Sequence, residues 1–135
     1  MHFDDLFIGQ SYSITRIFTP EEIAVFSQLS HDTNPLHTDP EYATKSIFGQ
    51  TIVPGFLTAS VFSAIIGTQM PGKGTIYLNQ NLSFIKPVYP MQEVVATVTV
   101  KDLYAEKKRA LLETICTDRS GNILIEGSAL VKIGS

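Results

Sequence analysis

The chain has 135 residues, a length that fits one domain with a substantial buried core. Hydrophobic residues make up 44% of it and charged residues 17%, which is typical of a globular protein and not of a disordered one. The net charge of −3 comes without a basic cluster, which argues against nucleic acid as the main partner, because phosphate binding needs clustered lysine and arginine.

The cysteine content and the first residues of the chain indicate where in the cell the protein is located. Cys116 is the one cysteine of the chain, so no internal disulfide can form, and this fits a reducing compartment. The start of the chain lacks the basic residues and the apolar run of a signal peptide, and no window of 18 apolar residues occurs. We therefore expect a single domain over residues 1–135, located in the cytoplasm and without a membrane span.

The first predicted elements are a strand and a helix. Residues 11–18 alternate between apolar and polar side chains, which predicts a half-buried strand. Thr19 then begins a helix, with Pro20 at the first helical position and Glu22 completing a capping box. We expect this helix to pack an apolar face on the core, because apolar residues recur at helical spacing: Ile23, Phe26 and Leu29.

A polar bend follows this helix. Asn34-Pro35 is a turn signal, because the residue before proline is pushed out of the helical region and asparagine bonds readily to nearby backbone. Asp32 and His37 therefore lie on either side of a bend and do not share one helical face. A carboxylate and an imidazole that converge on one water molecule can transfer protons, so we interpret this pair as candidate acid–base groups.

Two further helices are predicted. The first begins at Asp39-Pro40 by the same capping rule and ends before Gly49. The second lies within residues 53–69 and is apolar on nearly every side from Phe56 onward, which predicts a helix that is buried all round. At about 1.5 Å per residue it would be roughly 20 Å long, too short to cross a membrane.

The rest of the chain predicts a sheet. Alternating patterns indicate four strands, over residues 75–85, 94–100, 109–117 and 123–133. Residues 120–122, Ser-Gly-Asn, are typical of a hairpin turn, so the last two strands should be antiparallel. Gly127 suggests a bulge or a strong bend. The element order predicts an α+β fold with a consecutive antiparallel sheet curled on the long helix.

The region from Phe26 to Ala43 resembles the hydratase 2 motif of the MaoC-like (R)-specific enoyl-CoA hydratases. That motif has a Gly-Asp-x-Asn-Pro-apolar-His core, with an aromatic residue upstream and a small residue six positions after the histidine. Six residues of this chain match it: Asp32, Asn34, Pro35, Leu36, His37 and Ala43. Two positions depart, because His31 stands where the family usually has glycine and Phe26 where it often has tyrosine.

This resemblance implies a fold, an activity and partners. The fold would be a single hot-dog domain, in a homodimer that holds the substrate near the subunit interface. The activity would be a hydro-lyase reaction of fatty acid metabolism, the reversible hydration of trans-2-enoyl thioesters to (R)-3-hydroxyacyl thioesters. The acyl chain would be carried by CoA or acyl carrier protein. No metal or organic cofactor would be needed, because the thioester itself supplies the activation.

The resemblance also implies roles for single residues. Asp32 and His37 would share the general base and general acid roles, and Asn34 would shape the turn and orient them. Gly55 directly precedes the long helix, so its N–H lies at a helix N-terminus. From the residues alone this glycine fits tight packing as well as oxyanion binding, and the resemblance favours a donor to the thioester carbonyl. Ser60, one turn into the helix, would line the acyl tunnel or simply pack.

Three other classes of protein are alternatives to a hydratase. A hot-dog acyl-CoA thioesterase would hydrolyse its substrate and would not need the Asp-x-Asn-Pro-x-His bend. A 3-hydroxyacyl-acyl-carrier-protein dehydratase would run the same reaction backwards, and a non-catalytic acyl-binding module would not need both polar residues. We expect no metal site, because the neighbours His31 and Asp32 normally point apart and no fourth ligand is evident nearby.

Overall fold

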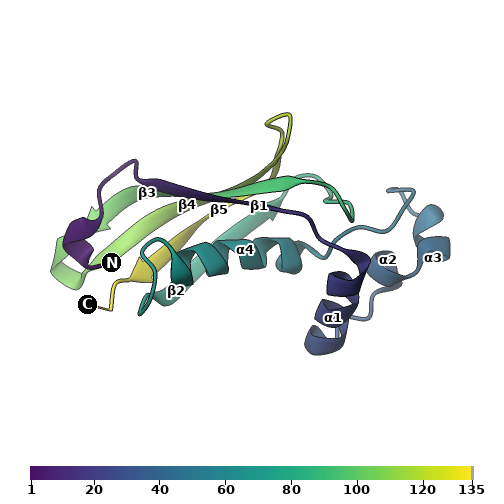
Figure 1. Ribbon diagram of the computed structural model, residues 1–135, viewed down its shortest axis with the longest axis horizontal. Helices are drawn as coiled ribbons and strands as arrows, with labels where there is room; N and C mark the ends of the chain where they lie inside the picture. The colour runs from purple at the N-terminus through teal and green to yellow at the C-terminus, as the bar shows by residue number, and fades with distance from the viewer. Residues whose placement is uncertain (135) are drawn as a thin grey trace.

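The longest helix, α4 (Gly55–Thr68), lies across one face of a five-stranded antiparallel sheet in the computed structural model, which describes residues 1–134 (Figure 1). The strands are β1 (Ser11–Arg16), β2 (Ile76–Phe84), β3 (Val94–Tyr104), β4 (Arg109–Asp118) and β5 (Ile123–Lys132). The other helices are α1 (Pro20–Ser30), α2 (Pro35–Thr38), α3 (Pro40–Thr44) and the short 3-10 turns η1 (Phe3–Asp5) and η2 (Ala105–Lys107). The predicted element order is thereby confirmed.

The strands follow the order β1-β3-β4-β5-β2, so β1 and β2 form the two edges of the sheet. All neighbouring pairs are antiparallel. Helices α1, α2 and α3 lie together beyond one end of the sheet, next to the start of α4 (Figure 1). The long chain segment that connects β1 to α4 therefore places its polar bend at the N-terminus of the central helix.

The core lies between α4 and the sheet. Alternate residues of β3 are buried because successive side chains of a strand point to opposite faces. They meet one face of α4, whose buried apolar residues are Val61, Phe62, Ile65 and Ile66. Each such side chain contributes about 1.5–3 kcal/mol by leaving water, so this interface fixes the helix on the sheet.

Helix α4 is not buried all round, contrary to the expectation from its apolar sequence. Phe56 is 70% exposed, and Ser63 and Ala64 on the same helix are also exposed. The sheet of this chain covers only one side of the helix (Figure 1). The apolar pattern therefore correctly predicted a helix, but it overestimated how much of that helix one copy of the chain covers.

Helix α1 begins as predicted. Thr19 Oγ1 accepts the Glu22 N–H at 3.1 Å, and Glu22 Oε1 accepts the Thr19 N–H at 3.0 Å, which completes the capping box. The expected apolar face is only partly right, because Ile23 is buried but Leu29 is 80% exposed. The reason is that α1 lies beyond the end of the sheet, where its last turn has no core to pack on (Figure 1).

The β4–β5 hairpin has the predicted turn. Gly121 adopts a positive φ of 85°, and Asp118 donates its N–H to Asn122 O at 3.0 Å. The Asp118 carboxylate accepts hydrogen bonds from Asn122 and Ser120, and these lower its pKa below the ordinary value. The turn is thus fixed by both its backbone and its acidic side chain.

Gly127 does not form the bulge that its position in a strand suggested. The register runs through it without a shift, with Leu82 opposite on one side and Thr114 on the other. A Cβ added at residue 127 would lie 1.9 Å from the main-chain oxygen of Asn81. The glycine is therefore needed for the close approach of β5 and β2, and the bulges lie elsewhere, one of them between Tyr77 and Asn79.

Candidate active site

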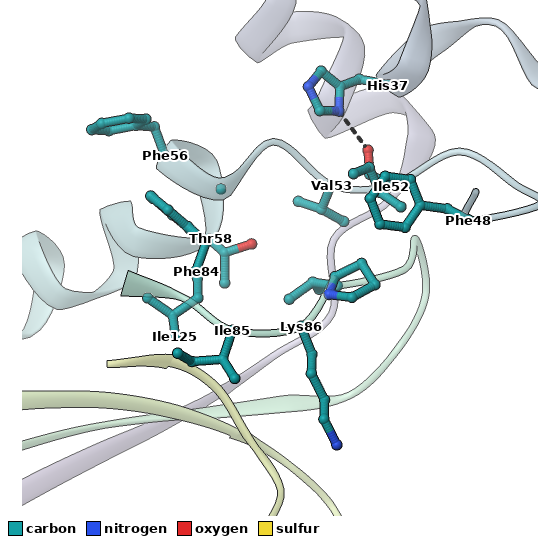
Figure 2. Close-up of a pocket in the computed structure, with 13 residues that line it drawn as sticks. His37, Phe48, Ile52, Val53, Phe56, Thr58, Phe84, Ile85, Lys86 and Ile125 are labelled. Carbon is teal, nitrogen blue, oxygen red and sulfur yellow. Dashed lines mark hydrogen bonds between the residues drawn. The ribbon is translucent and has the colours of Figure 1, made fainter. Parts of the chain in front are cut away.

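A cavity of about 360 Å³ opens where α2, the N-terminus of α4 and the segment after β2 meet (Figure 2). Most of the residues that line it are apolar, among them Phe48, Phe56, Phe84 and Ile125. The polar contributions come from four residues: His37, Gly55, Thr58 and Lys86. A largely apolar hollow with a few polar groups is the usual form of a small-molecule site.

His37 is positioned by the one-turn helix α2. Asn34 is the N-cap of this helix, and its Oδ1 accepts the Leu36 N–H at 3.1 Å, while Pro35 occupies the first helical position. The turn predicted at Asn34-Pro35 is therefore the start of a helix. The capping side chain and the fixed φ of proline explain why so short a helix forms here.

The His37 ring is oriented by the main chain of Ile52. Its Nδ1 lies 2.8 Å from Ile52 O (Figure 2). A carbonyl oxygen can only accept, so Nδ1 carries the proton of this hydrogen bond, and Nε2 of the neutral ring is left with its lone pair. In addition, the Ile52 N–H donates to Leu36 O at 3.3 Å, and the Val53 N–H donates to Val88 O at 2.7 Å. These contacts present a proton acceptor at the cavity.

Asp32 lies on the exposed loop between α1 and α2. Its Oδ1 accepts the Asn34 N–H at 3.2 Å, and its main-chain oxygen accepts the Ser27 hydroxyl at 2.5 Å. The residue before it, His31, is the C-cap of α1 and has a φ of 64°. Glycine adopts this left-handed conformation most readily, which gives a physical reason for the glycine that the motif usually has at this place.

Gly55 is the first residue of α4. The N–H groups of Leu57 and Thr58 both donate to Pro54 O, at 3.0 and 3.2 Å, whereas the Gly55 N–H has no partner among residues 1–134. A Cβ at this position would lie 2.4 Å from Cε1 of Phe84. Gly55 thus meets the packing requirement and also presents a free donor at the positive end of a helix dipole.

The structure brings His37 and Gly55 to one cavity. Asp32 and Asn34 precede α2 on its loop side and, among the described residues, are not part of the cavity lining. Ser60 lies away from this cavity, because it borders separate hollows beside β2 and beside α1, and its hydroxyl donates to Leu57 O at 2.6 Å.

Sequence reasoning missed Thr58. This residue is 1% exposed and lines the cavity one turn after Gly55. Its Oγ1 has no hydrogen-bond partner in the part of the chain that the structure describes. The signal that could have identified it is a hydroxyl at helical spacing from Gly55 within an otherwise apolar helix.

The described residues outside the cavity offer neither a metal site nor a reactive thiol. Over residues 1–134, no three His, Cys, Asp or Glu side chains are close enough together to hold a metal ion. Cys116 is fully buried on β4, and burial raises the pKa of its thiol to about 11. It is therefore protonated at neutral pH and is a core residue.

None of the helices within residues 1–134 combines the length and apolar character that a membrane crossing requires.

The MaoC-like domain model matches residues 7–120, so the chain belongs to the MaoC-like family. It is 43% identical over 133 residues to an (R)-specific enoyl-CoA hydratase of Aeromonas caviae, with 98% of this chain and 99% of the relative covered. An (R)-specific enoyl-CoA hydratase of Rhodospirillum rubrum is 42% identical over 132 residues, with 98% and 91% covered.

Solved structures agree with this assignment. The structure described as the (R)-hydratase from A. caviae involved in PHA biosynthesis superposes with a TM-score of 0.92 at 44% identity and covers 95% of this chain and 97% of its own. The predicted hot-dog fold, a curled antiparallel sheet with a long helix, is thereby confirmed.

Proposed function

We propose that this protein is an (R)-specific trans-2-enoyl-CoA hydratase, which adds water to 2-enoyl thioesters and forms (R)-3-hydroxyacyl thioesters. The observation that carries the proposal is the identity of 42–43% to two hydratases of this specificity over 98% of the chain. The hydratase 2 motif residues, Asp32, Asn34 and His37 among them, lie within that match.

The proposed reaction begins with the thioester carbonyl on the Gly55 N–H. This contact draws electrons toward the carbonyl oxygen and makes the β-carbon electrophilic. Water adds through its oxygen to the β-carbon and gives up a proton, and the α-carbon takes up a proton. In this proposal His37 acts from the cavity lining and Asp32 from the exposed loop before α2, and the two share these transfers as acid and base, with Asn34 shaping the turn between them. Support comes from the Nδ1 contact with Ile52 O, which leaves His37 Nε2 free to accept.

The substrate would carry its acyl chain into the apolar part of the cavity. Phe48, Val53 and Ile125 supply walls that exclude water from the chain. The carrier is CoA in the proposed reaction, and an acyl-carrier-protein thioester is tested beside it. No organic cofactor enters the reaction, and the single buried cysteine fits the reducing cytoplasm that we propose as its location.

We also propose that the protein acts as a homodimer, joined through the free edge of β2. This edge strand and the residue after it expose large apolar side chains on both faces: Ile76, Tyr77, Leu78, Phe84 and Ile85. An exposed apolar strand edge is usually paired or covered. Sedimentation velocity should find a species of twice the chain mass, and a monomer at micromolar concentration would contradict this proposal.

The activity is tested on crotonyl-CoA by the loss of its enoyl-thioester absorbance, with chiral analysis of the product. We expect (R)-3-hydroxybutyryl-CoA. The single variants Asp32→Asn and His37→Ala should each reduce kcat by about 10²–10⁴-fold while circular dichroism stays unchanged. Thiol release from saturated acyl-CoA without hydration of crotonyl-CoA, of a longer enoyl-CoA or of a carrier-protein thioester would instead support a thioesterase.

A further inference from the structure

Thr58 presents an unpaired hydroxyl to the cavity. The residue is 1% exposed, and its Oγ1 is buried without a hydrogen-bond partner among residues 1–134. In Figure 2 its oxygen points toward the side of the cavity on which Val53 lies. A buried polar group without a partner destabilises a fold, so its presence calls for a reason in function.

Two other hydroxyl residues of α4 have hydrogen-bonded side chains. Thr68 Oγ1 donates to Ala64 O at 2.6 Å and Ser60 Oγ donates to Leu57 O at 2.6 Å, the usual back-bonding of hydroxyl residues in helices. Thr58 is the same residue type as Thr68 on the same helix, and it does not make this bond. Its hydroxyl proton is therefore available to a molecule in the cavity.

The position of Thr58 places its hydroxyl at the cavity, one turn of α4 after Gly55. Residues three apart in a helix share one face, and helical side chains tilt toward the N-terminus of the helix. Thr58 and Gly55 thus lie on one face of the first turn of α4, and both residues line the same cavity. Two hydrogen-bond donors that reach the same atom of a bound ligand are the arrangement that binds an oxyanion.

We propose that Thr58 Oγ1–H is a second hydrogen-bond donor to the thioester carbonyl oxygen, beside the Gly55 N–H. This inference rests on the hydratase function proposed above. As water bonds to the β-carbon, the electron pair of the double bond moves toward the carbonyl and places negative charge on its oxygen. Thr58 stabilises that charge and keeps its own proton, and the charge is removed when the α-carbon is protonated.

The test compares Thr58→Val, which has nearly the same shape without the hydroxyl, with Thr58→Ser, which retains the hydroxyl. Thr68→Val is the matched control, because it removes a hydroxyl of α4 that is already bonded. Activity is measured on crotonyl-CoA, and the carbonyl stretch of bound, 13C-labelled butyryl-CoA is measured by infrared difference spectroscopy. Butyryl-CoA has no double bond, so its spectrum reports carbonyl polarisation without turnover.

We expect Thr58→Val to lower kcat roughly 100-fold and to move the bound carbonyl stretch to higher frequency. Thr58→Ser and Thr68→Val should resemble the wild type in both measurements. The melting temperature of Thr58→Val should equal or exceed that of the wild type, because an unpaired buried hydroxyl is lost.

The proposal is overturned if Thr58→Val keeps the wild-type rate, or if its rate falls while the bound carbonyl stretch stays unchanged, since the hydroxyl then acts only on the fold. Failure of Thr58→Ser to recover the rate also overturns it. If the valine variant does not fold, Thr58→Ala removes the same hydroxyl and is judged by the same outcomes. A wild-type protein that hydrates no enoyl thioester would instead refute the proposed function.

Discussion

The ring of Phe84 lies against Gly55 so closely that a Cβ at residue 55 would be 2.4 Å from Cε1 of the ring. Phe84 is 49% exposed and its ring centroid is 5.8 Å from that of Phe56. Gly55→Ala should therefore push this ring into the cavity mouth and misplace a bound thioester. We expect kcat/KM on crotonyl-CoA to fall about 100-fold, because a displacement of about 1 Å is enough for such a loss.

A double-mutant cycle separates this clash from other effects of the methyl group. Phe84→Ala alone keeps Gly55 and its donor, and Gly55→Ala with Phe84→Ala gives the methyl group room. If the clash explains the loss, the double variant should recover most of the activity of Phe84→Ala. Equal losses in Gly55→Ala with and without Phe84 would disprove the steric explanation.

His31 carries a conformational cost that can be removed. Its φ of 64° is unfavourable for a side chain with a Cβ, whereas glycine adopts it freely. We expect His31→Gly to raise the free energy of unfolding by about 1 kcal/mol, measured by urea denaturation. The hydration rate should stay within a factor of a few, because the His31 side chain is exposed and does not line the cavity.

Two glycines should respond in opposite ways to alanine. Gly127→Ala places a methyl group 1.9 Å from Asn81 O, an atom of the backbone that cannot swing away, so β2 must separate from β5. We expect a loss of about 3 kcal/mol or more of stability. Gly67→Ala on α4 meets no atom within 4 Å and should stabilise the helix by about 1 kcal/mol. Chemical denaturation of both variants measures these changes, and a neutral Gly127→Ala would contradict the close strand contact.

The buried thiol of Cys116 makes stability fall in alkali. Burial raises its pKa from 9.0 to about 11, so between these values the unfolded chain has lost a proton that the folded chain keeps. This contribution to stability is fully present below pH 9 and is lost as pH rises through 11. From pH 8 to 10.5 the wild type should lose about 2 kcal/mol more than Cys116→Ala, in urea unfolding at each pH. Parallel curves for the two proteins would exclude Cys116 as the cause.

The periodicity of the sequence was sufficient to predict which segments form helices and which form strands. Capping at Thr19 and Asp39, and the turn at Gly121, follow from local chemistry, and each is present in the structure. The end of the third strand was less predictable, because the register shifts between Val100 and Asp102 and this breaks the two-residue alternation. The strand therefore continues to Tyr104, beyond the predicted end.

What the sequence could not provide was the direction of side chains relative to the cavity. The exposure of Leu29 and the outward position of Ser60 depend on where the sheet ends and on which side of α4 it covers. Thr58 was missed for the same reason, because a hydroxyl can be recognised as unpaired only when the positions of all its possible hydrogen-bond partners are known. His37 and Gly55 were found from motif and helix position, which are properties of short segments.

The main chain and the side chain of Ile52 have separate roles. Its main-chain N–H and C=O both bond to α2, one to Leu36 and the other to the His37 ring, while its side chain forms part of the cavity wall. A substitution at this position changes the wall but leaves the main-chain bonds in place. The shape of the cavity can thus vary from one protein sequence to another while the imidazole stays where it is, so that substrate range can evolve without disturbing the histidine.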